Sequence, residues 1–100
     1  MSVIVIGRMN VDPAAVEKLW AERAADFQAV ASAAKAVGAT HHRWGFADDH
    51  IVIIDEWPDA ETFHSFFGGQ PKIAELMQAA GVQGPPEFQI FRAAEGPDQF

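Results

Sequence analysis

Residues 51–59 constrain the fold of this chain more than any other stretch. The first seven, Ile-Val-Ile-Ile-Asp-Glu-Trp, include five apolar side chains, which is typical of a strand buried on both faces. Pro58 cannot donate a backbone hydrogen bond to a sheet, so the strand should end there. Asp59 is suited to cap a helix that begins at Ala60. We therefore expect a buried strand that ends in two acids and a tryptophan, where ligand pockets often form.

Local signals predict the other elements of the chain. Asp12-Pro13 marks a helix start, with Asp12 as the capping residue and Pro13 at the first helical position. Helical periodicity then runs from residue 13 to 37. It predicts either one helix of roughly 37 Å or a helix that bends or breaks near the alanine-rich segment at Ala31. The remaining predicted elements are strands over residues 3–9, 40–47 and 87–93, a helix after Asp59 that Gly68-Gly69-Gln70-Pro71 breaks, and a further helix that ends at Gly81.

The order β-α-β-β-α-α-β predicts an α+β fold, a ferredoxin-like split βαβ with one four-stranded antiparallel sheet. Residues 1–94 would form a single domain, and residues 95–100 a loose C-terminal tail. Helices cover only one face of such a sheet, yet the strands are apolar on both faces. The uncovered face would expose an apolar patch of a size that monomers rarely show. We therefore expect a symmetric homodimer that closes sheet against sheet.

Charge and composition argue against several classes of partner. The chain has 14 acidic and 7 basic residues, a net charge of −7, which argues against binding to nucleic acid. It has no cysteine, so disulfides and thiolate zinc sites are excluded. The apolar run at residues 3–6 is too short for a signal peptide or a membrane span. We expect a soluble, cytoplasmic protein with no metal site and no membrane partner.

Two segments carry a resemblance to a known family. The run Asp55-Glu56-Trp57-Pro58-Asp59, followed by Phe63, resembles the E-x-W-x-[DS]-x-x-x-[FY] signature of the antibiotic biosynthesis monooxygenase family. Pro71-x-x-Ala74-Glu75-Leu76 and Gly81-x-x-Gly84-Pro85-Pro86 resemble most the small, cofactor-free, polyketide quinol-forming oxygenases of that family. The resemblance is tight over residues 51–67 and 71–91. It implies a dimeric α/β barrel that oxidises a phenol or hydroquinone with O2 and without a cofactor.

The chain departs from that family at positions that matter for activity. Trp57 matches the tryptophan that lines the cavity of the family's oxygenases. Phe63 stands where tyrosine is common, Ile53 stands where the polyketide enzymes have asparagine, and the chain contains no tyrosine. These changes remove donors that would hold a substrate oxygen. A second interpretation therefore stays open: a non-catalytic protein that binds a small aromatic or hydrophobic ligand, or a structural dimer.

The predicted hairpin brings one histidine next to one aspartate. A turn centred on Asp48-Asp49 pairs His42 with Asp55, and cross-strand partners share a face. A carboxylate fixes the tautomer of a neighbouring imidazole, which suits His42 to act as a general base with Asp55 and Trp57 beside it. The alternative is a structural hydrogen bond at a dimer interface, and a slip of one residue in the turn would remove the pairing. The predicted substrate-binding residues are Trp44, Phe46, Ile53, Phe63 and Phe66.

Overall fold

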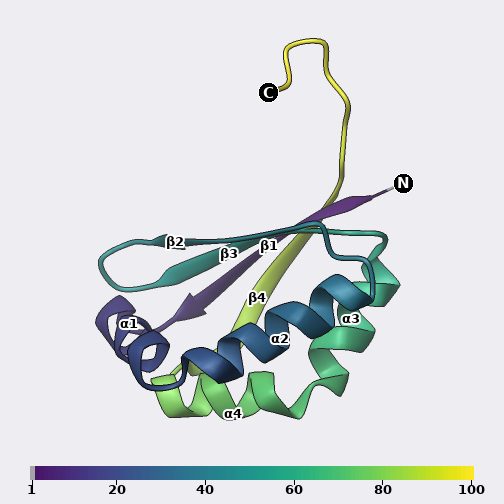
Figure 1. Ribbon diagram of the computed structural model, residues 1–100. Coiled ribbons are helices and arrows are strands. Elements are labelled where there is room, and N and C mark those ends of the chain that lie inside the picture. Colours follow the sequence, from purple (N-terminus) through teal and green to yellow (C-terminus); the bar gives the residue numbers. More distant parts are fainter. Residues whose placement is uncertain (1) are drawn as a thin grey trace.

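The computed structural model describes residues 2–100, which form four strands and four helices. Their order is the predicted one, except that the first helix is divided in two. Figure 1 shows all four helices on one side of the sheet. The elements are β1 (Val3–Asn10), α1 (Pro13–Glu22), α2 (Ala24–Ala36), β2 (His41–Phe46), β3 (Ile51–Trp57), α3 (Ala60–Gly69), α4 (Pro71–Ala80) and β4 (Gln83–Arg92).

The strands form one antiparallel sheet in the order β2-β3-β1-β4. Strand β1 is central and pairs with β3 on one side and with β4 on the other. With helices on one face, this is the ferredoxin-like α+β arrangement, and the predicted fold class is confirmed. The sheet therefore has an inner face under the helices and an outer face on the opposite side (Figure 1).

Helix α3 begins where the sequence predicts. Asp59 caps it, because one oxygen of its carboxylate accepts a hydrogen bond from the backbone N–H of Thr62 at 2.7 Å. The same hydrogen bond lowers the pKa of Asp59, since it favours the ionised carboxylate. Asp12 caps α1 in a similar way through the N–H of Ala14, at 3.0 Å. These local caps explain why both helix starts could be predicted from the sequence.

The predicted helix over residues 13–37 is broken, and the break lies at Arg23 (φ −132°, ψ 37°) rather than near Ala31. A straight helix over that length would measure roughly 37 Å, close to the longest dimension of the molecule, 39 Å. The break lets α1 lie near the β2–β3 hairpin while α2 crosses the sheet towards α3 (Figure 1). The predicted position of the break was wrong, because the local composition of the helix does not show where the size of the molecule requires the chain to turn.

Strand β4 begins at Gln83, four residues before the predicted start. It includes Pro85 and Pro86, which lie before the strand predicted over residues 87–93. Because β4 is an edge strand that pairs only with β1, a missing backbone N–H is tolerated there. The pairing of β4 with β1 shifts register between Arg8 and Asn10.

Strand β3 is buried on one face only. Ile51, Ile53, Asp55 and Trp57 are buried on the inner face, whereas Ile54 on the outer face is 43% exposed. The prediction of a strand buried on both faces is wrong for the single chain, because helices cover only the inner face. Alternation of this kind is usual for a sheet with one covered face.

The core consists of two clusters on the inner face. Val5, Trp57 and Phe63 form one cluster beneath α3, and Val5 and Phe63 are 0% and 1% exposed. Met9, Val11, Val16 and Ile51 form the other, next to α1. Helix α2 contributes no buried residue to either cluster.

The last residues of the chain leave the body of the molecule. After β4, residues 93–100 form neither helix nor strand and extend away from the helices (Figure 1). That this tail is loose stays a prediction. Between residues 2 and 100, no helix is both long enough and apolar enough to span a bilayer.

Candidate functional site

A cavity of about 400 Å³ lies between α2 and the inner face of the sheet. Its lining comes mainly from β2, β3 and α2, with apolar side chains of β1, α1, α3 and α4. Small-molecule sites typically measure roughly 300–1,000 Å³ and are mostly apolar with a few polar groups. The cavity meets both conditions, and it includes the end of β3 to which the sequence pointed.

Helix α2 encloses the cavity without filling it. Phe27, Val30, Ala31 and Ala34 line the cavity, and their spacing of i, i+3, i+4 and i+7 places them on one face of the helix. Two of these four residues are alanines, whose side chains are too short to reach the sheet. Space therefore remains beneath α2, and no residue of the helix is buried.

Three side chains at the sheet side of the cavity form a hydrogen-bonded chain. Nδ1 of His42 lies 2.6 Å from one carboxylate oxygen of Asp55, and the indole N–H of Trp57 donates to the other oxygen at 3.1 Å. Asp55 is 6% exposed. Strands β2 and β3 pair His42 with Asp55 and Trp44 with Ile53, so the predicted hairpin register is confirmed.

This chain of contacts determines which atoms a ligand can use. An ionised carboxylate only accepts hydrogen bonds, so His42 donates from Nδ1, and Nε2 carries the free lone pair. The side chain of His42 is 45% exposed and lines the cavity. The N–H of Trp57 is occupied by Asp55 and is not free for a ligand oxygen. Within residues 2–100, the indole N–H of Trp44 has no hydrogen-bond partner and remains a donor.

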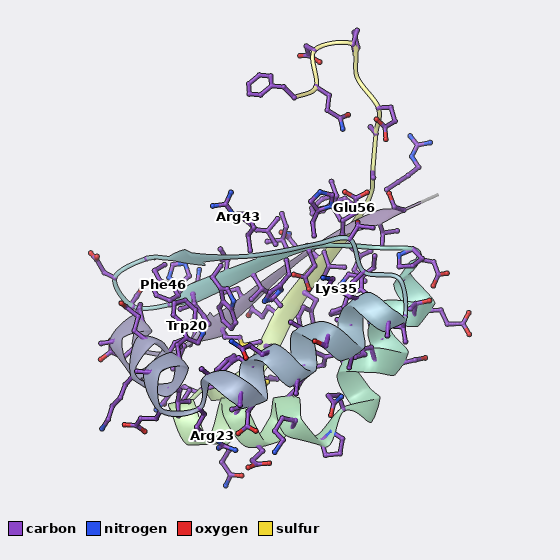
Figure 2. The ribbon with its side chains drawn as sticks, viewed as in Figure 1. Trp20, Arg23, Lys35, Arg43, Phe46 and Glu56 are labelled. Carbon is purple, nitrogen blue, oxygen red and sulfur yellow. The ribbon has the colours of Figure 1, made fainter. Side chains whose placement is uncertain are left out.

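Most of the predicted substrate-binding residues line the cavity, but one does not. Trp44, Ile53, Phe63 and Phe66 belong to the lining together with Trp57. Phe46 lies outside it. Its ring is stacked on that of Trp20 with centroids 5.3 Å apart, near the hairpin end of the sheet (Figure 2), and it is 40% exposed.

Sequence reasoning missed the contribution of α2. The helical periodicity of residues 13–37 predicted a helix there, and it gave no role in a site to Phe27 or Lys35. In the structure both residues line the cavity, and among residues 2–100 Lys35 is the only lysine or arginine that does so. The available signal was the eight-residue spacing between Phe27 and Lys35, which places them on the same helix face.

An ion-pair network fixes one end of α2. It consists of Arg23, Asp26, Lys72 and Glu75, and the guanidinium of Arg23 contacts both Asp26 and Glu75. Hydrogen bonds from Arg23 hold the pKa of Asp26 and of Glu75 below the usual range of carboxyl groups. Arg23 lies on the side of the helices away from the sheet (Figure 2), so the network ties α2 to α4 outside the cavity.

Residues 2–100 contain no group of three or more His, Cys, Asp or Glu side chains that is placed to hold a metal ion. The histidines of β2 illustrate the reason. His42 faces the cavity, whereas Nδ1 of its neighbour His41 lies 3.5 Å from Glu56, which Figure 2 shows on the outer face. Adjacent residues of a strand point to opposite faces, so these two are not placed to bind one metal ion together.

The fold matches several solved structures over almost the whole chain. ActVA-Orf6, a monooxygenase of Streptomyces coelicolor determined in complex with nanaomycin D, matches with a TM-score of 0.67 and 22% identity, over 97% of this chain and 93% of that chain. SnoaB, a cofactor-independent oxygenase from Streptomyces nogalater, matches with a TM-score of 0.65 and 23% identity, over 98% of each chain. The chain has the fold of the antibiotic biosynthesis monooxygenases.

A third solved structure, described as an antibiotic biosynthesis monooxygenase, matches with a TM-score of 0.63 and 14% identity, over 93% of this chain and 99% of that chain. No protein-family model matches the sequence, and no curated protein sequence matches it. The resemblance seen at residues 51–67 and 71–91 is thus confirmed as a likeness of fold. At these identities the fold alone is established, and the activity depends on the site.

Proposed function

We propose that this protein is a cofactor-independent monooxygenase that oxidises a phenol or hydroquinone with O2 in the cavity beneath α2. The observation that carries the proposal is the 2.6 Å contact between His42 and Asp55 in a cavity whose lining is mostly aromatic and apolar. This pair supplies a general base where a flat, electron-rich ring can bind. SnoaB, which is described as a cofactor-independent oxygenase, has the same fold and adds support for this kind of reaction.

The reaction begins with proton transfer. Nε2 of His42 takes the phenolic proton, and Asp55 stabilises the imidazolium that forms. The phenolate gives one electron to O2, which yields an aryloxyl radical and superoxide. These two combine at a ring carbon, and His42 returns the proton to the resulting peroxide. Loss of water then gives a quinone. One oxygen atom stays in the product and the other leaves as water, so no external reductant is required.

The aromatic lining supports these steps in two ways. Trp44, which is only partly buried, offers a flat ring on which an aromatic substrate can stack, and the buried ring of Trp57 lines the cavity behind it. The N–H of Trp44 is the indole donor that can reach a developing phenolate oxygen, because Asp55 occupies the N–H of Trp57. An apolar cavity also excludes water from the radical pair and the peroxide.

The test is oxygen consumption by metal-stripped protein with a panel of naphthols, anthrones and hydroquinones. General-base assistance is typically worth about 10²–10⁴-fold, so His42→Ala should slow oxygen uptake by that factor with little effect on the melting temperature. His50→Ala is the matched control, because His50 contacts Asp49 in the hairpin turn and does not line the cavity. Undiminished activity in His42→Ala would remove the base, and a requirement for flavin or iron would refute the cofactor-free reaction.

A second candidate is a protein that binds an aromatic ligand without turnover. It is favoured by the occupied N–H of Trp57 and by the phenylalanine at position 63, because the cavity then has few donors to hold a substrate oxygen. Saturable binding of the same panel with no oxygen uptake would select this function over the first.

We also propose that the outer face of the sheet binds a second copy of the chain. Ile54 and Phe91 are 43% and 47% exposed on this face, beside the partly buried Ile4 and Ile6. Ile54→Asp should convert a dimer into a monomer of about 11 kDa in sedimentation, because the dimer would bury that charge. A wild-type monomer at micromolar concentration would rule out the dimer.

A further inference from the structure

We propose that Lys35 makes the cavity selective for aromatic substrates that carry a carboxylate. The inference rests on the proposed function, because it names the substrate class of the same cavity. Lys35 is the last member of the α2 face that lines the cavity, eight residues after Phe27 and four after Ala31. Figure 2 shows it on the side of α2 that faces the sheet.

The surroundings of Lys35 suit an anion. Around the start of β2, the cavity lining includes Lys35, Thr40 and His42, and it also includes part of His41, whose Nδ1 lies near Glu56. Among the described residues, Asp55 is the only carboxylate in the lining, and it already accepts hydrogen bonds from His42 and Trp57. A lysine in such a position runs its methylene groups along an apolar surface and keeps its ammonium group in water at the edge. The cavity therefore has an apolar interior and one cation at its rim.

The charge of Lys35 is not used within the protein. The chain has three lysines; Lys18 pairs with Glu22, and Lys72 pairs with Asp26 and Glu75. Lys35 forms no ion pair with any residue between 2 and 100. In a chain with a net charge of −7, an unpaired cation at the rim of this apolar cavity should attract anionic ligands.

A flat aromatic acid complements both features. Its rings fill the apolar interior, and its carboxylate forms a charge-assisted hydrogen bond with the ammonium group of Lys35. An acid group held at the rim also restricts how the rings can lie, so the same reacting carbon is presented on each binding event. A neutral aromatic compound of equal size lacks this restraint.

Lys35 also lies in the last turn of α2, where a cation interacts favourably with the helix dipole. That role concerns helix stability alone, and it predicts no difference between charged and neutral ligands. Selectivity between two matched ligands therefore separates a binding role from a purely structural one.

The experiment compares 1-hydroxy-2-naphthoate with 1-naphthol, which share the same rings and differ in the carboxylate. Binding is followed by quenching of tryptophan fluorescence and by calorimetry under nitrogen, so that no turnover occurs. Lys35→Met should weaken naphthoate binding about five- to tenfold and change naphthol binding less than twofold, as expected for one partly exposed charge-assisted contact. Lys35→Glu should weaken naphthoate binding further, and Lys35→Arg should retain the preference. Lys18→Met, which removes a paired surface lysine, should change neither affinity.

Three results would overturn the proposal. These are no binding of naphthoate to the wild-type protein, an equal loss for both ligands in Lys35→Met, and an unchanged naphthoate affinity in a Lys35→Met variant that melts as the wild type does. Because binding is measured without O2, a protein that binds naphthoate through Lys35 yet consumes no oxygen would refute the proposed oxidation and leave the role of Lys35 standing.

Discussion

Helices α2 and α3 cover the same face of the sheet, but they pack against it in different ways. Helix α3 inserts Phe63, which is 1% exposed and contacts the rings of Trp57 and Phe88 at centroid distances of 5.5 and 5.0 Å. Helix α2 has no buried residue and leaves a cavity of about 400 Å³ beneath it. The inward residues of α3 are phenylalanines, whereas those of α2 include alanines, so side-chain size decides which helix fills its space.

The sheet beneath α3 is adapted to the same close packing. A Cβ atom at Gly7 of β1 would lie 2.7 Å from the ring of Phe88, so glycine provides the room in which that ring packs against Phe63. Helix α2 is instead fixed at its ends. The ion pairs of Arg23 hold the first turn, and the N–H of Ala39 bonds to the carbonyl oxygen of Ala34 after the last turn. The comparison indicates that α3 stabilises the fold and α2 encloses the site.

Replacing a phenylalanine by alanine in each of the two helices should give the largest difference in stability between them. Phe63→Ala should lower the free energy of unfolding by about 3–5 kcal/mol, because it creates a cavity in the packed core. Phe27→Ala should lower it by about 1 kcal/mol or less, because the ring of Phe27 is only partly buried and borders existing space. Urea denaturation followed by tryptophan fluorescence measures both values. An equal loss of unfolding free energy in both variants would contradict the conclusion that α3 is packed into the core whereas α2 only encloses the cavity.

Filling the space beneath α2 should have an intermediate effect. Ala31→Phe directs a ring into the cavity, so binding of 1-naphthol should weaken by more than about tenfold while stability changes by about 1 kcal/mol or less. Ala29→Phe is the matched control, since Ala29 lies on the same helix but does not line the cavity. Calorimetry gives the affinities. Unchanged naphthol binding in Ala31→Phe would place the ligand elsewhere.

The ion-pair network at the start of α2 should give the smallest effect, and one that depends on pH. Arg23 lowers the pKa of Asp26 and of Glu75 in the folded protein. Their stabilising contribution is therefore present above the unfolded pKa values, near pH 4, and is lost as the pH falls through the lower folded values. We expect a level melting temperature from pH 7 to 5 and a decrease below about pH 4.

Variants and salt sharpen this last prediction. Asp26→Asn should melt at a lower temperature than the wild type at pH 7, with a smaller further loss between pH 5 and 3. The difference should shrink in 0.5 M salt, because exposed ion pairs are screened. Glu17→Gln, at an exposed position of α1, should behave as the wild type does. A wild-type acid transition that Asp26→Asn leaves unaltered would show that the network does not hold α2.

Local signals in the sequence determined the order of the elements, the caps at Asp12 and Asp59 and the pairing of His42 with Asp55. Each depends on a few neighbouring residues, through proline and glycine conformations, side-chain caps and the two-residue period of a strand. The two-residue period also places Trp44, Ile53 and Trp57 on one face. Nearly all of the candidate site on the sheet could therefore be predicted.

Only the tertiary structure decided the break at Arg23, the cavity beneath α2 and the hydrogen bond from Trp57 to Asp55. It also decided that Phe46 stacks on Trp20 rather than lining the cavity. These features depend on how segments distant in the sequence pack against one another. The gap beneath α2 arises because α3 and the sheet set the spacing of the layers while the alanines of α2 are too short to fill it, and no local pattern in the chain records that distance.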